Sequence, residues 1–436
     1  MLKAGFGKVS ITPPTGAPLA GFAARKGVCV GAHDDLFARA MVIDNGSAAV
    51  ALVGLDLLAV PAGFVNRARQ AVAARVPVAA GGVMIACTHT HAGPVTISTF
   101  FNPGESVDPQ YIERLTGAIE EAVVSAWERR FEARIGIGSA RIEALGVNRR
   151  SPDGRPVDEE IGIIKVADSR GSTWAVLVNY ACHPTVLGPD NLLATGDFPG
   201  VTAGRMEAML GPGSFAMYFN GAEGDISVGH SSELSAIGVI APGRTFERAA
   251  ELGQRLADAA LPALETIETK GHADLGFLSL TVNLRLKQFP SPEAAAKALS
   301  EAEVKVERLR HAGDSSPEYR QAKSELLYAS ITHYYAREAA RFPEGLMPIE
   351  LQGIRIQDGV LVGVPGEMFV EIGLRAKRSA RRRLFIVGLA NGYIGYLPSR
   401  RAYEAGGYEV VSARCDPETE DRLAEAIMEL EERLIG

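Results

Sequence analysis

Short, continuous apolar runs constrain the fold of this chain more than any other feature of its sequence. A half-solvated strand alternates apolar and polar residues, whereas a continuous apolar run is typical of a strand buried on both faces. Amphipathic helical patterns lie between many of these runs, for example over residues 108–130, 243–267 and 416–434. Strands that alternate with helices predict an α/β fold, here a mixed β-sheet core flanked by helices. The runs are AAVALVGLDLL, GVMIAC, TWAVLVNYAC, SFAMYF, GVLVGVP and LFIVGL.

One segment departs from this alternation. From about Pro290 to Phe342 the sequence predicts two long helices joined near Gly313. The spacing of charges along the first of them is typical of a solvated helix. There is no internal repeat, low-complexity tract or change of composition that marks a linker. We therefore expect a single domain over residues 1–436, with a helical hairpin inserted at about 290–342.

Charge and hydropathy exclude two classes of partner. A net charge of −7 argues against nucleic-acid binding, which needs a dense basic surface. The longest apolar run is interrupted by Asp56 and is too short to cross a bilayer, so no stable membrane insertion is expected. The N-terminus lacks the apolar core of a secretory signal, and four widely spaced cysteines fit a reduced protein. We expect a cytoplasmic protein, and its oligomeric state stays open.

Polar side chains suited to metal or acid–base chemistry follow five of the predicted strands. In open α/β sheets, ligands bind beyond the carboxyl ends of the strands. His89 and His91 follow GVMIAC, and an extended chain would direct both to one face; surface or capping roles are the alternative. The other strands are followed by His183 and Asp197, by Asp225 and Ser227, by Glu367, and by Tyr393 and Tyr396.

These side chains favour a particular metal. Imidazole, carboxylate and phenolate groups without a thiolate pair fit a catalytic zinc site, although manganese or iron could use the same ligands. Structural roles stay open for several candidates. Asp197 could be a helix cap, Ser227 a turn residue, Tyr393 and Tyr396 packing aromatics and His33 a structural histidine, and the directions of Glu223 and His230 are not fixed.

At these positions the sequence resembles the neutral, non-lysosomal ceramidases, a family of zinc-dependent amidases that cleave the N-acyl bond of ceramide. Each motif alone is short, but all of them stand in the family's order. The opening AGFGKVSITPP is also similar to that family's N-terminal strand. The motifs are THTHAGP at Thr88–Pro94, HPT at His183–Thr185 with Gly196–Asp197 after it, GDIS at Gly224–Ser227, PGE at Pro365–Glu367, and GLANGYIGY at Gly388–Tyr396.

The resemblance implies a ligand set for zinc. The second tyrosine of the family's pair ligates the metal, so Tyr396 is expected in this role rather than Tyr393. The implied zinc ligands are His89, His183, Glu367 and Tyr396.

The resemblance also implies catalytic residues. His91 would lie beside the metal as a proton donor or oxyanion partner, and Ser227 would be the catalytic serine close to the zinc-bound water. An arginine of the family's Asn-Arg-Ser pattern would bind the substrate carbonyl or oxyanion. That pattern reads Asn148-Arg149-Arg150-Ser151 here, with one extra arginine. Arg149 is our choice, and Arg150 stays open.

The sequence departs from the family's pattern at several points. Val228 follows Ser227 where the family usually has proline, and Ser10 stands where it usually has aspartate. The family's additional β-sandwich domain and its common secretion signal are not found, so we expect the catalytic domain alone. The predicted function is zinc-dependent hydrolysis of an amide bond, in a lipid or small-molecule N-acyl substrate, by metal-activated water. The alternatives are a small cyclic amide, a lactone or another soluble acyl substrate, or a non-catalytic small-ligand-binding protein.

Overall fold

A large mixed β-sheet forms the centre of the protein. The structure, a computed structural model, describes residues 1–101, 106–150 and 156–436. The sheet has the strand order β11-β9-β8-β6-β1-β3-β4-β5. β4 pairs in parallel with β5, and β9 with β11, while the other neighbours are antiparallel. Its strands are β1 (Lys3–Ser10), β3 (Phe37–Asp44), β4 (Ala49–Leu55), β5 (Val83–Cys87), β6 (Phe131–Arg141), β8 (Glu160–Asp168), β9 (Thr173–Tyr180) and β11 (Phe215–Asn220).

A second sheet packs against the first. It has the order β13-β14-β15-β17, formed by β13 (Leu275–Arg285), β14 (Leu346–Ile356), β15 (Gly359–Gly363) and β17 (Arg383–Val387). One buried cluster contains Met41 and Leu52 of the large sheet together with Ile354 and Phe385 of the small one. The apolar runs of the sequence are therefore strands covered on both faces, as predicted: β4, β5, β9, β11, β15 and β17.

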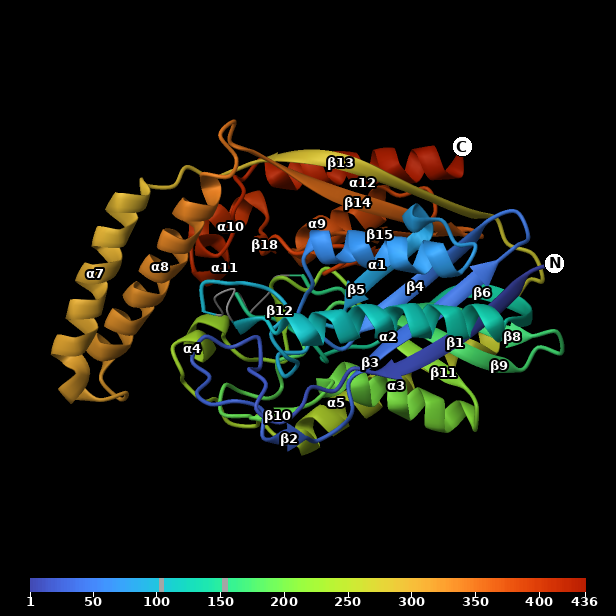
Figure 1. Ribbon diagram of the computed structural model, residues 1–436, viewed down its shortest axis with the longest axis horizontal. Coiled ribbons are helices and arrows are strands. Elements are labelled where there is room, and N and C mark those ends of the chain that lie inside the picture. Colours follow the sequence, from blue (N-terminus) through green and yellow to red (C-terminus); the bar gives the residue numbers. More distant parts are fainter. Residues whose placement is uncertain (102–105, 151–155) are drawn as a thin grey trace.

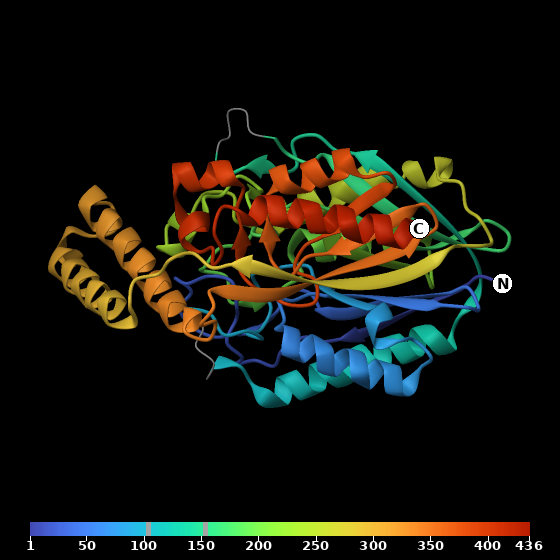
Figure 2. The ribbon, with the colours of Figure 1, turned by 90° about the horizontal axis from the view of Figure 1, so that it is seen from above.

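Helices cover the outer face of each sheet, which gives four layers (Figure 2). α2 begins where the sequence predicts, because the Asp108 carboxylate accepts a hydrogen bond from the Gln110 amide and Pro109 occupies the first turn. The predicted fold class, a mixed sheet core flanked by helices, is confirmed. The large sheet is covered by α1 (Ala62–Arg75), α2 (Pro109–Glu128), α3 (Asp197–Leu210) and α5 (Phe246–Ala260), and the small sheet by α9 (Val370–Ser379) and α12 (Thr419–Ile435).

Two further helices project from one end of these layers (Figure 1). They are α7 (Pro292–Leu309) and α8 (Pro317–Ala339), and they fall where the sequence predicts a helical pair. Ser291 and Ser316 cap their first turns. Gly313 lies between them with a φ of +75°, a conformation that favours glycine. Among the residues that the structure describes, no helix has the length and apolar character needed to cross a membrane.

Pairs of two-residue strands connect the loops beyond the sheets. β16 (Glu367–Met368) pairs in parallel with β18 (Tyr396–Leu397), and β7 (Val147–Asn148) pairs with β12 (Ile226–Ser227). A third pair joins β2 (Gly31–Ala32) to β10 (Leu193–Ala194). The first two pairs join segments that carry candidate site residues. The remaining short helices are η1 (Ala80–Gly82), α4 (Ser232–Ala236), α6 (Ala263–Thr266), η3 (Arg310–Ala312), α10 (Arg400–Ala405) and α11 (Tyr408–Val411).

Candidate metal centre

The turn after β5 directs His89 and His91 into the same site. The strand ends at Cys87, and His89 adopts a left-handed φ of +71°, so the extended conformation does not continue through the motif as expected. The backbone amide of His89 donates to Leu57 O at 3.0 Å, and its Nδ1 donates to Leu58 O at 2.8 Å. The Nε2 atoms of the two histidines lie 3.4 Å apart. Their convergence therefore depends on a strained turn, not on strand alternation.

His183 enters the site from the end of β9. Its backbone amide donates to Ile226 O at 3.0 Å, and its Nδ1 donates to Glu223 O at 2.8 Å. These contacts orient the ring so that its Nε2 lies 3.0 Å from Oε2 of Glu367. The same carboxylate oxygen lies 3.6 Å from Nε2 of His89. Glu367 therefore lies between two imidazoles that come from distant segments.

The two tyrosines of the GLANGYIGY motif make different contacts. The Tyr393 hydroxyl donates to Oε1 of Glu367 at 2.6 Å. Tyr396 is paired with Glu367 in the β16–β18 register, and its hydroxyl accepts from Nη2 of Arg149 at 3.0 Å. Its ring is stacked near the ring of His183, with centroids 6.3 Å apart. Both tyrosines belong to the site, and Tyr393 makes the direct contact with the carboxylate.

Burial lowers the pKa of two imidazoles of the site, those of His91 and His183. Burial, aided by the Arg149 guanidinium, lowers the pKa of His183 to about 4. Burial and the neighbouring His89 and His183 lower the pKa of His91 well below its usual value. Burial alone would raise the pKa of Glu367, but His89 and His183 hold it well below its usual range. Neutral imidazole and ionised carboxylate are the forms in which these two kinds of side chain bind a metal.

The hydrogen bonds of the histidines fit a metal centre. Because Nδ1 of His89 and of His183 each faces a carbonyl oxygen, Nδ1 carries the proton and Nε2 carries the lone pair. Both lone pairs face the carboxylate of Glu367, which is also an acceptor. A cation bound between them would interact favourably with the two nitrogens and the carboxylate. Candidate ligand atoms of His89, His91 and His183 lie within 4.8 Å of one another, as do those of His89, Glu223 and Glu367. The residues present therefore fit a divalent metal.

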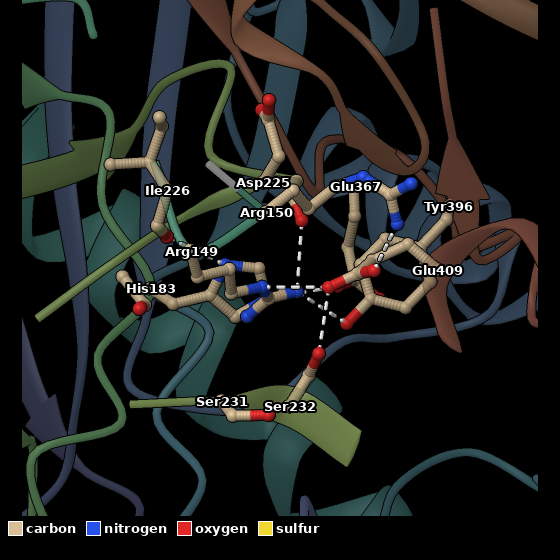
Figure 3. Close-up of polar contacts among 12 residues, drawn as sticks. Arg149, Arg150, His183, Asp225, Ile226, Ser231, Ser232, Glu367, Tyr396 and Glu409 are labelled. Carbon is tan, nitrogen blue, oxygen red and sulfur yellow. Dashed lines mark hydrogen bonds and ion pairs between the residues drawn. The ribbon is translucent and has the colours of Figure 1, made fainter. Parts of the chain in front are cut away.

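A buried ion-pair network adjoins this cluster (Figure 3). Arg149 binds Oε1 of Glu409 through Nε at 2.9 Å, and its Nη2 donates to Gly224 O at 2.9 Å as well as to Tyr396. Arg150 binds the other oxygen of Glu409 at 2.6 Å but extends to Gly406 O. The Ser232 hydroxyl also donates to Glu409. Arg149 is thus the arginine that reaches the cluster, and Ser151 of the same motif lies outside the described residues.

Two small cavities border the centre. One, of about 40 Å³, is lined by His89, His91, Glu367, Tyr393 and Tyr396 among others. The second, of about 30 Å³, is lined by His91, Arg149 and Tyr396. A wider cavity of about 710 Å³ lies next to them and shares Phe100 and Phe101 with the first. The centre is therefore enclosed, with a larger space beside it.

The other polar candidates have structural contacts. The Asp197 carboxylate accepts from the amides of Val186 and Phe198 and so fixes the loop after His183. Asp225 accepts from the Val370 amide and from the Asn148 side chain.

Ser227 is buried in β12, and its hydroxyl donates to His230 O at 3.0 Å. It is not among the residues that line either small cavity. The structure thus brings His89, His91, His183, Glu367, Tyr396 and Arg149 together and leaves the Ser227 hydroxyl in a local turn.

Sequence reasoning missed several residues of this site. Glu409 lies on the short helix α11, outside any motif, and no sequence signal could have found it. Arg25 donates to His91 O at 2.7 Å from an N-terminal loop. The direction of Glu223 was unknown, although its place three residues after β11 and beside Gly224 is a weak signal.

Taken together, the four-layer fold and the enclosed histidine, carboxylate and tyrosine cluster define an α/β protein with a candidate metal centre at the ends of its strands. The chain belongs to the neutral/alkaline non-lysosomal ceramidase family: residues 2–232 match the model of that family's N-terminal region. The resemblance found in the sequence motifs is confirmed.

Known relatives cover most of the chain. It is 24% identical to a neutral ceramidase of Drosophila pseudoobscura pseudoobscura, over 98% of this chain and 74% of the relative. Neutral ceramidase B of Dictyostelium discoideum is 22% identical over 77% of this chain and 58% of the relative. The crystal structure of neutral ceramidase from Pseudomonas aeruginosa superposes with a TM-score of 0.77 at 21% sequence identity. The superposition covers 99% of this chain and 74% of the Pseudomonas aeruginosa chain. This structural similarity concerns the fold.

Proposed function

We propose that the protein is a zinc-dependent hydrolase that cleaves an amide bond of an N-acyl substrate. One observation carries the proposal: the Nε2 lone pairs of His89 and His183 both face the ionised carboxylate of Glu367 in a buried site. Two imidazole lone pairs and a carboxylate oxygen that face one another in a buried site repel unless a cation or a shared proton lies between them. Membership of the ceramidase family supports amide hydrolysis as the reaction.

His89, His183, Glu367 and Tyr396 would hold the zinc. When bound, zinc would supply Lewis acidity, which polarises a carbonyl and brings the pKa of water down to about 7. Manganese and iron accept the same donor atoms, so zinc is our choice on chemical grounds.

The side chains around the cluster would stabilise the charge that develops on the substrate carbonyl oxygen. Arg149 is buried with its guanidinium at the cavity wall, where a fixed positive charge is most effective. His91 stays neutral because its pKa is lowered, so its N–H would act as an oxyanion partner more readily than as an acid. These two residues lie on the same small cavity.

Ser227 keeps its predicted role of orienting the attacking water. For that role its hydroxyl would have to turn away from His230 O, which it contacts in the present conformation. A covalent acyl-serine is not proposed, because among the described residues no imidazole or carboxylate is hydrogen-bonded to this hydroxyl.

We propose an N-acyl amine as the substrate class. The relatives are named neutral ceramidases, and one similar structure is described as a ceramidase complexed with C2. Both lipid and soluble N-acyl amines would fit this class. We also propose one domain over residues 1–436, supported by a core cluster that joins Leu2 to Phe385 and Val387. The cytoplasmic location stays a prediction.

The proposal is tested by measuring metal content and turnover together. Purified protein is expected to bind about one zinc per chain and to hydrolyse at least one compound in a panel of N-acyl amines, ceramides, lactones and small cyclic amides. His89→Ala and His183→Ala should each remove bound zinc and activity. His311→Ala, which alters an exposed histidine of η3, is the matched control and should leave both unchanged.

Two results would contradict the proposal. Full turnover in a zinc-free His89→Ala protein would exclude metal-dependent catalysis. Wild-type protein that binds no zinc but still binds a small ligand unaffected by His89→Ala would favour a non-catalytic binding protein.

A further inference from the structure

The carboxyl group of Glu223 is buried beside the candidate centre. Its residue is 0% exposed. Neither carboxylate oxygen accepts a hydrogen bond from another residue within the described chain, 1–101, 106–150 and 156–436. A buried carboxylate is normally paired, hydrogen-bonded or bound to a metal, because burial otherwise removes it from water without compensation. Glu223 therefore lacks a structural explanation of its own.

The local backbone directs this carboxylate into the cluster. Glu223 lies between β11 and β12, and its backbone carbonyl accepts from Nδ1 of His183. A carboxylate oxygen of Glu223 lies within 4.8 Å of a ring nitrogen of His89 and of a carboxylate oxygen of Glu367. Gly388 leaves the space that the side chain needs, since a Cβ there would lie 2.6 Å from Oε2 of Glu223. One residue thus orients a ligand through its main chain and presents a carboxylate through its side chain.

The two groups of candidate ligands would bind the same ion. His89 belongs to both groups, but its Nδ1 is bonded to Leu58 O, so only its Nε2 is free to bind a metal. A single lone pair serves a single metal, which excludes separate ions for the two groups. The Tyr396 hydroxyl accepts a hydrogen bond from Arg149, whereas neither oxygen of Glu223 accepts one from any other residue that the structure describes.

We propose that Glu223 is a ligand of the same metal as His89, His183 and Glu367. This inference rests on the proposed metal-dependent function. The donor set would then contain two imidazoles, two carboxylates and the Tyr396 phenol, and the combined charge of −2 on the two carboxylates would balance a divalent cation. Carboxylate and imidazole donors are ordinary ligands of zinc and of manganese.

Zinc affinity of Glu223→Gln tests the proposal directly. Glutamine has the same shape as glutamate, so the fold should be retained, and circular dichroism checks this. We expect zinc affinity, measured by competition with a chromophoric chelator, to fall at least about 10-fold. Loss of a residue that only supports a ligand already lowers metal affinity by about 10-fold or more, and loss of a ligand should have at least this effect. The visible absorption of the cobalt-substituted protein should also change, because the ligand field changes. Glu223→Asp, which withdraws the carboxylate by one methylene, should weaken zinc binding in the same direction.

Glu431→Gln is the matched control. Glu431 is also 0% exposed, and its Oε2 has no hydrogen-bond partner in the described part of the chain, but it lies on α12 and its Oε1 accepts from the Arg382 amide. Its variant should bind zinc as the wild type does.

Wild-type affinity and an unchanged cobalt spectrum in both Glu223 variants would overturn the inference. The proposed function would still stand if His89→Ala lost its zinc in the same assay. Wild-type protein that takes up no zinc would contradict the proposed function itself, and this inference with it.

Discussion

At the scale of single residues, the two adjacent arginines show how neighbours in sequence differ in role. Both bind Glu409, so charge pairing alone does not separate them. Arg149 also reaches Tyr396 and lines the small cavity, whereas Arg150 extends to Gly406 O on the other side. The surroundings of each guanidinium therefore favour Arg149 as the residue that meets substrate.

Replacing each arginine by lysine tests this assignment. Lysine keeps the charge but lacks the planar guanidinium, which reaches Glu409 from Nε and Tyr396 from Nη2 at the same time. We expect Arg149→Lys to lower kcat/KM about 100-fold, as for the loss of an oxyanion donor, with zinc content unchanged. Arg150→Lys should change kcat/KM only a few-fold and chiefly lower the unfolding temperature. Steady-state kinetics on both variants would refute the assignment if Arg150→Lys were the more damaging.

At the scale of elements, the hairpin of α7 and α8 forms part of the surroundings of the site. The Tyr335 hydroxyl of α8 donates to Ser412 O, and that of Tyr334 donates to Ser98 O. Closer to the N-terminus of α8, the side chains that line the cavity of about 710 Å³ include Lys323, Leu326 and Leu327. The sequence predicts the helices but not this contact with the site. We interpret the cavity as the space for the acyl group of the substrate.

A charged residue in that cavity tests the interpretation. Leu326→Arg should lower kcat/KM for long-chain N-acyl substrates at least about 10-fold more than for N-acetyl ones, because each methylene transferred from water contributes about 0.8 kcal/mol. Val304→Arg on α7, where the side chain is 66% exposed, is the matched control and should have no effect. Equal losses across a series of acyl chain lengths would show that the cavity does not hold the acyl group.

At the scale of the whole molecule, stability depends on a few buried ionisable groups. Asp56 follows β4 and accepts the Phe37 amide at 2.9 Å. Burial raises the pKa of its carboxyl from 3.8 to about 6. The folded protein therefore holds this proton more tightly than the unfolded chain does. Its contribution to stability is complete below the unfolded pKa and is lost as the pH rises through about 6.

Asp56→Asn should remove this pH dependence. Between pH 4.5 and 7.5 the variant's free energy of unfolding should fall by about 2 kcal/mol less than that of the wild type, since one pKa unit corresponds to about 1.4 kcal/mol. Urea titrations at the two pH values measure the difference. The other ionisable groups are shared by both proteins and cancel in the comparison. Identical pH dependence would show that Asp56 does not carry a raised pKa.

Particular elements show how far the sequence could predict the fold. The runs at β4, β5 and β17 were predictable because strands buried on both faces need continuous apolar residues. The start of α2 was predictable from Asp108 and Pro109, which cap its first turn. The packing of the second sheet against the first was not predictable, because it depends on which faces of the two sheets meet in space. Met41 and Phe385 share a core although nothing in the sequence relates them.

The sequence by itself determined the residue types of the site and the motifs that hold them. His89, His183, Glu367 and Tyr396 come after apolar runs of the sequence, and the resemblance to the ceramidase family implies that they are metal ligands. Only the tertiary structure decided that Tyr393 contacts Glu367, that Arg149 and not Arg150 reaches the cavity, and that Glu223 faces His89. Local sequence fixes backbone propensities and the ends of elements. The direction of a side chain depends on turns and packing between segments that lie hundreds of residues apart, and those relations exist only once the chain has folded.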